Sequence, residues 1–137
     1  MMRFVVAILA YLVPTFLLGF VWHLILFKNY YEALAMYRSD VIIPLGLLSM
    51  AIQSAIFAWL YMQIFARRDD RFWIRTLAYG QIGAVLSWSF TTLAVAAKNV
   101  MASVPDYLAI ETSFTVVQWI MVAPLTVLAF RRLSVST

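Results

Sequence analysis

A chain of 137 residues that is 65% hydrophobic and 12% charged has the composition of a membrane protein and leaves no room for a separate soluble domain. The absence of cysteine excludes disulfide exchange, thiolate metal sites and cysteine nucleophiles, and with them the four-helix quinone-linked disulfide oxidoreductases. A net charge of +4 would suggest nucleic acid in a soluble protein, but in a membrane protein basic residues mark the cytoplasmic ends of spans. We therefore expect no nucleic-acid partner.

Four apolar stretches follow one another along the chain, and each is long enough to cross a bilayer. A helical span needs about 20 residues, because a rise of ~1.5 Å per residue must cover a ~30 Å hydrocarbon layer. The stretches are Phe4–Phe27, Val41–Phe65, Trp73–Ala97 and Leu108–Phe130. They predict an all-α integral membrane fold, a four-transmembrane-helix antiparallel bundle that forms one domain over residues 1–137.

The first stretch has a basic start at Arg3, as a signal peptide does. Its apolar run is longer than the ~7 to 15 residues of a signal peptide, and no small-residue cleavage site follows it. We therefore expect it to be retained as a span. Between the first two spans, Asn29–Tyr37 is aromatic and mildly amphipathic, which predicts a short helix at the outer interface.

Helix boundaries are marked by proline at two places. Pro44 falls in the first turn of the second span, and Ser103–Asp106 has the composition of a turn leading into the fourth.

The distribution of Lys and Arg predicts the orientation of the spans, because cytoplasmic loops carry the excess of positive charge. Seven basic residues fall on one side: Arg3, Arg67, Arg68, Arg71, Arg75, Arg131 and Arg132. Three fall on the other: Lys28, Arg38 and Lys98. The sequence thus predicts a multi-pass protein of the cell inner membrane with both termini in the cytoplasm and with its basic side on anionic lipids.

Helical wheels place small and polar residues on one face of each span. On the third span this face predicts close helix packing through Gly80, Ala84, Ser87 and Thr91. The corresponding faces of the other spans contain Tyr11, Thr15 and Gly19, then Gly46, Ser49, Met50, Gln53 and Tyr61, and finally Glu111, Thr115, Gln118 and Val122.

The candidate ligand or proton site lies near the outer end of the bundle. His23 and Glu111 both fall about one turn below the same surface, and Lys98 ends the third span on that side. Gln118 follows Glu111 on the same face of the fourth span. An ionisable residue inside a span indicates function because its burial is costly, yet Glu111 near a helix N-terminus is also favoured by the macrodipole. His23 beside Trp22 could equally be an interfacial anchor.

One histidine, one intramembrane glutamate and no cysteine are a poor ligand set for a metal or a haem. We expect no metal and no cofactor, no catalytic residue and no enzymatic activity.

A resemblance rests on three patterns, which are Gly19–His23, Phe27–Tyr31 and Pro44–Gly46. Over residues 11–55 the chain resembles small bacterial four-span inner-membrane proteins of unknown function. The resemblance implies a four-helix membrane fold and carries no activity with it.

Two functional hypotheses follow. The first is an accessory subunit or scaffold that packs on a larger membrane complex. The alternative is a small dimeric binding or transport module with a titratable outer-facing site at Glu111, His23 and Lys98. The absence of a charge near the midplane favours the first, since proton-coupled carriers place their ionisable groups there.

Overall fold

The computed structural model describes residues 2–38, 40–65 and 71–131, and all regular structure in these ranges is helical. The elements are α1 (Met2–Val21), the π-helical segment η1 (Trp22–Leu26), α2 (Lys28–Ala33), α3 (Ile43–Ile64), α4 (Phe72–Ser87), the π-helical segment η2 (Trp88–Leu93), α5 (Ala94–Ala96) and α6 (Val104–Phe130). Arg67, Arg68 and Arg132 of the predicted basic side lie outside the described residues.

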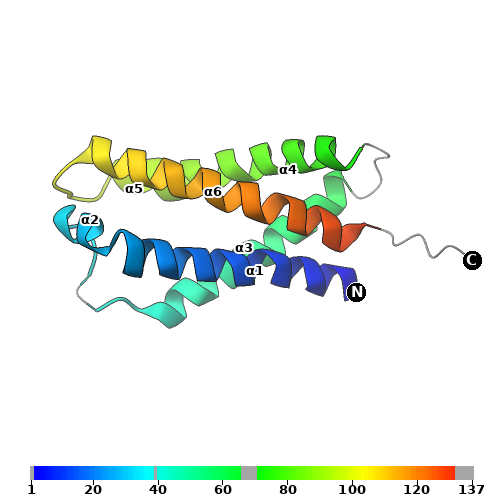
Figure 1. Cartoon of the computed structure of the whole chain (residues 1–137), viewed down its shortest axis with the longest axis horizontal. Coiled ribbons are helices and arrows are strands. Elements are labelled where there is room, and N and C mark those ends of the chain that lie inside the picture. The colour runs from blue at the N-terminus through cyan, green and yellow to red at the C-terminus, as the bar shows by residue number, and fades with distance from the viewer. Residues whose placement is uncertain (1, 39, 66–70, 132–137) are drawn as a thin grey trace, which may run out of the picture.

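The long helices run along the long axis of the molecule, except that α3 crosses obliquely behind α1 (Figure 1). Element α1 continues into η1, and α4, η2 and α5 likewise form one continuous helix. Helix α1 begins and helix α6 ends at the same end of the molecule, which we call the terminal end (Figure 1). Helix α2 lies at the opposite end, which we call the α2 end.

Three helices are long and apolar enough to cross a membrane: Met2–Leu26, Ile43–Ile64 and Val104–Phe130. The continuous helix Phe72–Ala96 is not among these candidates, because Arg75, Gln81 and several serines and threonines lower its hydropathy. The molecule is therefore a small all-α protein with three candidate membrane spans among its described residues.

The predicted helix boundaries are met closely except at the start of the fourth apolar stretch. Both ends of each of the first three apolar stretches lie within two residues of the ends of the corresponding helix. Pro44 is in the first turn of α3 as predicted. Helix α6 begins at Val104 rather than Leu108, because the Ser103 hydroxyl caps it by accepting from the backbone N–H of Asp106 at 3.4 Å. The residues predicted as a turn are thus the cap and first turn of α6.

The indole ring of Trp119 on α6 lies where the long helices meet. It contacts Tyr11 of α1, Phe57 of α3 and Tyr79 of α4, with ring centroids 5.8, 4.9 and 5.6 Å away. All four rings are buried. Edge-on aromatic contacts of this kind contribute about 0.5–1.5 kcal/mol each beyond the area they bury, so this ring holds four helices together.

The predicted packing face of the third apolar stretch meets α6 in part. Gly80, Ala84 and Ser87 of this face are half-buried, and Thr91 is exposed. A Cβ atom at Gly80 would lie 3.2 Å from the Cβ of Ala123. The closest approach is at Gly83, which the prediction omitted and where a Cβ atom would overlap the Trp119 ring.

Helix α3 packs only along its second half. Its buried residues are Ser54, Phe57, Ala58 and Tyr61. Residues 43–49 are all exposed, and a Cβ atom at Gly46 would have no neighbour within 4 Å. The prediction that Gly46 and Ser49 lie on a buried face is therefore wrong, because a helical wheel does not reveal that a helix crosses the bundle at an angle and leaves it.

The predicted interfacial helix is shorter than expected and is packed on the bundle. Helix α2 ends at Ala33, and Ala35 then adopts a left-handed φ of 55°, which stops the helix. Tyr31 and Leu34 are buried, and the Leu34 carbonyl accepts from the backbone N–H of Ala102 at 2.9 Å. The segment thus covers the end of the bundle.

We predict that Gly83→Ala lowers the thermal stability of the protein in detergent, by about 1–3 kcal/mol, because the added methyl group displaces the Trp119 ring. Gly46→Ala is the matched control. It adds the same methyl group to open space in a helix and should stabilise by about 0.5–1 kcal/mol. Equal melting temperatures for the two variants would show that Trp119 does not pack on Gly83.

Candidate functional site

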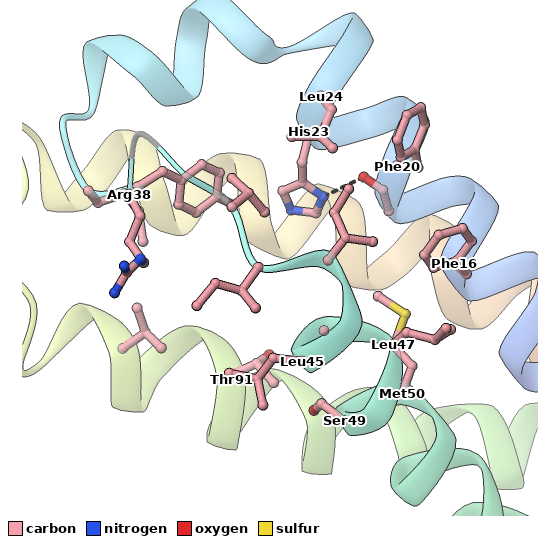
Figure 2. Close-up of a pocket in the computed structure, with 18 of the residues that line it drawn as sticks. Phe16, Phe20, His23, Leu24, Arg38, Leu45, Leu47, Ser49, Met50 and Thr91 are labelled. Atoms are coloured by element: carbon pink, nitrogen blue, oxygen red, sulfur yellow. Dashed lines mark hydrogen bonds between the residues drawn. The ribbon is translucent and has the colours of Figure 1, made fainter.

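The α2 end of the molecule contains a cavity of about 670 Å³. It lies where α3 diverges from α1, and the chain before α3, the end of the α4–α5 helix and the start of α6 complete its wall. Residues of α1, among them Phe16 and Phe20, face Leu47 and Met50 of α3 across it (Figure 2). Its polar lining residues are His23, Tyr37, Arg38, Ser49, Thr91, Asn99, Tyr107 and Glu111.

His23 and Glu111 meet in this wall. The Nε2 atom of His23 lies 3.2 Å from Oε1 of Glu111, and His23 Nδ1 lies 2.9 Å from the carbonyl oxygen of Gly19. A carbonyl only accepts, so Nδ1 carries a proton. The contact at Nε2 then requires one further proton, held either by the imidazole or by the carboxyl group. The pair therefore shares a single proton and is neutral overall in both arrangements.

Tyr31 of α2 completes the cluster. Its hydroxyl donates to the same Oε1 atom of Glu111 at 2.6 Å, and its ring centroid lies 4.8 Å from that of His23. Burial raises the pKa of the Tyr31 phenol, and the neighbouring Glu111 raises it further, so the phenol stays protonated and remains a donor. Because both contacts are made to Oε1, Oε2 of Glu111 has no hydrogen-bond partner among the described residues.

The π-helical geometry of η1 accompanies this arrangement. The extra residue in its turn widens the helix at His23, and η2 widens the facing helix near Thr91, which also lines the cavity. Single π-helical turns are rare and are frequent at functional sites. Both π-helical segments of the described chain thus lie beside the cavity.

The structure places the other two candidate site residues elsewhere. Lys98 is exposed in the turn after α5, and no ion pair joins it to Glu111 within the described ranges. The buried amide of Gln118 donates to Tyr11 and Thr15 of α1, at 3.2 Å in each case. Gln118 therefore joins α1 to α6, and His23 is the residue of the predicted set that lies against Glu111.

Tyr31 was missing from the predicted site. The sequence offers Tyr30, Tyr31 and Tyr37 with equal weight as residues of an aromatic belt. The rotational phase of α2 turns Tyr31 inward and leaves Tyr30 exposed. Tyr37 lies beyond the end of α2, where it lines the cavity and stacks on Tyr31 with ring centroids 5.0 Å apart.

No group of three or more His, Asp or Glu side chains that could hold a metal ion occurs in residues 2–38, 40–65 and 71–131. Comparison of the chain with family models, curated proteins and solved structures finds no match. The resemblance to small four-span proteins of bacteria therefore stays a prediction, and the site must be interpreted from its own geometry.

We predict that His23→Leu and Glu111→Leu each destabilise the protein by about 1–3 kcal/mol, because each removes the contact between the two side chains and leaves the remaining ionisable group largely withdrawn from water without it. The double variant should lose less than the sum of the two. Thermal unfolding of the four proteins in detergent at pH 7 measures this coupling. Additive losses would show that the two groups do not interact.

Proposed function

We propose that this protein is a four-span protein of the inner membrane that binds a small molecule in the cavity at the α2 end. In addition to the three candidate spans, Phe72–Ala96 is the remaining span, third in chain order, and it packs beside α6 through Gly80, Gly83 and Ser87. Helix α1 begins and α6 ends at the same end of the molecule, as an even number of spans requires (Figure 1). Both termini lie in the cytoplasm in this proposal, and the α2 end faces outward.

The observation that carries the binding function is the cluster of half-buried His23 with buried Glu111 and Tyr31 in the wall of a largely apolar cavity. Small-molecule sites are concave, enclose roughly 300–1,000 Å³ and combine apolar walls with a few convergent polar groups. The cavity meets the criteria of size and lining, and it is open along the exposed first part of α3. Its size and composition support a binding site rather than a packing defect.

A purely structural role accounts less well for the cluster. Burying an acid and a base inside a membrane protein is costly even when they are paired. Helices α1 and α6 are already joined by the Gln118 amide and by the contact of Trp119 with Tyr11. The ionisable pair is therefore not needed for this packing, and its position in the cavity wall favours a role toward a ligand.

An accessory subunit of a larger membrane complex is the second candidate. The observation that favours it is the fully exposed first part of α3, residues 43–49, which a helix of another protein could cover. Affinity purification in mild detergent separates the two functions. A stoichiometric partner protein would support the subunit, and a chain that purifies with a small molecule alone would support the binding protein.

The topology gives one test. Reporters that are active only in the cytoplasm should be active when fused to either terminus, because seven basic residues against three determine the orientation. A reporter inserted after Lys98 should be inactive. Activity at that position, or inactivity at the C-terminus, would contradict a four-span arrangement with cytoplasmic termini.

Filling the cavity gives the test of binding. Gly46→Trp places an indole in the cavity without a backbone clash, since Gly46 lines it and has open space beside it. The control is Leu48→Trp, at an exposed position of α3 outside the lining. Protein purified in mild detergent and then denatured should release a small molecule from the wild type and from the control. Its amount should fall about tenfold in Gly46→Trp, and equal amounts would contradict the proposal.

A further inference from the structure

The cavity is lined mainly by apolar side chains, with the hydroxyl groups of Ser49 and Thr91 among them and with ionisable side chains toward the α2 end. Phe16 and Phe20 of α1 and Leu47 and Met50 of α3 line the part that extends toward the middle of the bundle. His23 and the polar groups near it lie closer to the α2 end (Figure 2). This arrangement suits an amphiphile with its apolar chain between α1 and α3 and its head at the polar cluster.

The charges in the wall are balanced. His23 and Glu111 form a pair that is neutral overall, and Arg38 makes an ion pair of 3.1 Å with Asp40 beside the cavity. Both pairs already satisfy their own charges, so a charged head would lose its hydration without meeting an unpaired counter-charge in the described part of the wall. An uncharged head loses less on entry, so the site favours an uncharged head.

The available hydrogen-bonding groups specify the head further. Oε2 of Glu111 is an acceptor without a partner among the described residues, whereas Oε1 already receives Tyr31 and His23. A head that donates an O–H to Oε2 would satisfy this acceptor. Asn99 also lines the cavity, and its side-chain amide offers a further donor and acceptor.

We infer that the cavity binds an uncharged, hydroxyl-bearing amphiphile with a single apolar chain, taken up from the membrane leaflet at the α2 end. The inference rests on the proposed binding function and adds the chemical class of the ligand. The exposed first part of α3 leaves the apolar part of the cavity beside the acyl chains of the bilayer. The ligand can therefore enter along the membrane plane.

The test uses four C18 probes that differ only in their heads. Equilibrium binding of radiolabelled oleyl alcohol to the purified full-length protein in detergent at pH 8 is competed by oleate, oleylamine and the methyl ether of oleyl alcohol. We expect oleyl alcohol to bind with a 1:1 stoichiometry and to have a Kd about tenfold lower than each competitor. The methyl ether keeps the chain and loses only the donated hydrogen bond.

Two variants make the result specific to the cavity. Gly46→Trp should abolish binding of oleyl alcohol, and Leu48→Trp should leave its Kd unchanged. Equal Kd values for all four probes, or tighter binding of oleate or oleylamine, would overturn the inferred ligand class. In that case the proposed binding function would still stand if denatured Gly46→Trp released less small molecule than the denatured wild type.

Two further outcomes would overturn the inferred ligand class, and the first of them would also overturn the proposed binding function. Absence of binding by every probe, with the same content of native small molecule in Gly46→Trp and the wild type, would overturn both the inference and the proposed function. Loss of a dimer in Gly46→Trp without binding of any probe would identify a second copy of the chain as the occupant and would also overturn the inference.

Discussion

The contact of the Trp119 ring with Gly83 is the constraint on which the rest of the structure depends. Only glycine lets the backbone of α4 approach the indole, and from this position the ring touches α1 and α3 as well. Helices that meet at one level and cross at an angle must separate on either side of it. The aromatic contact in the middle of the bundle therefore allows α3 to leave α1 at the α2 end, and the cavity is the space that results.

The two ends of the bundle are closed in different ways. At the terminal end the rings of Tyr61, Tyr79 and Phe130 fill the space between α3, α4 and α6. At the α2 end aromatic rings also pack, but they surround the polar pair, and α2 covers it. Apolar packing closes the first end without regard to protonation, whereas the second also depends on a shared proton and on the hydroxyl of Tyr31.

The sequence predicted those features that depend on local pattern. Long apolar runs placed the helices, and periodicity placed Tyr11 and Thr15 on the buried face of α1 and Glu111 on that of α6. The divergence of α3 was not predictable, because the crossing angle depends on Gly83 and Trp119, which are distant in the sequence. The choice of His23 over Lys98 as the neighbour of Glu111 also depends on three-dimensional placement: equal depth made both of them candidates.

The hydrogen bonds of Glu111 couple the binding of a ligand to the position of the proton that Glu111 shares with His23. In the arrangement with a neutral imidazole, the shared proton is on the carboxyl group, which then accepts more weakly at its other oxygen. A hydroxyl donated to Oε2 stabilises the carboxylate, and the proton then resides on Nε2 of His23. A ligand of the inferred class thus selects the ion pair over the neutral pair. Because Tyr31 donates to the same carboxylate from α2, this arrangement also strengthens the contact that holds α2 over the cavity.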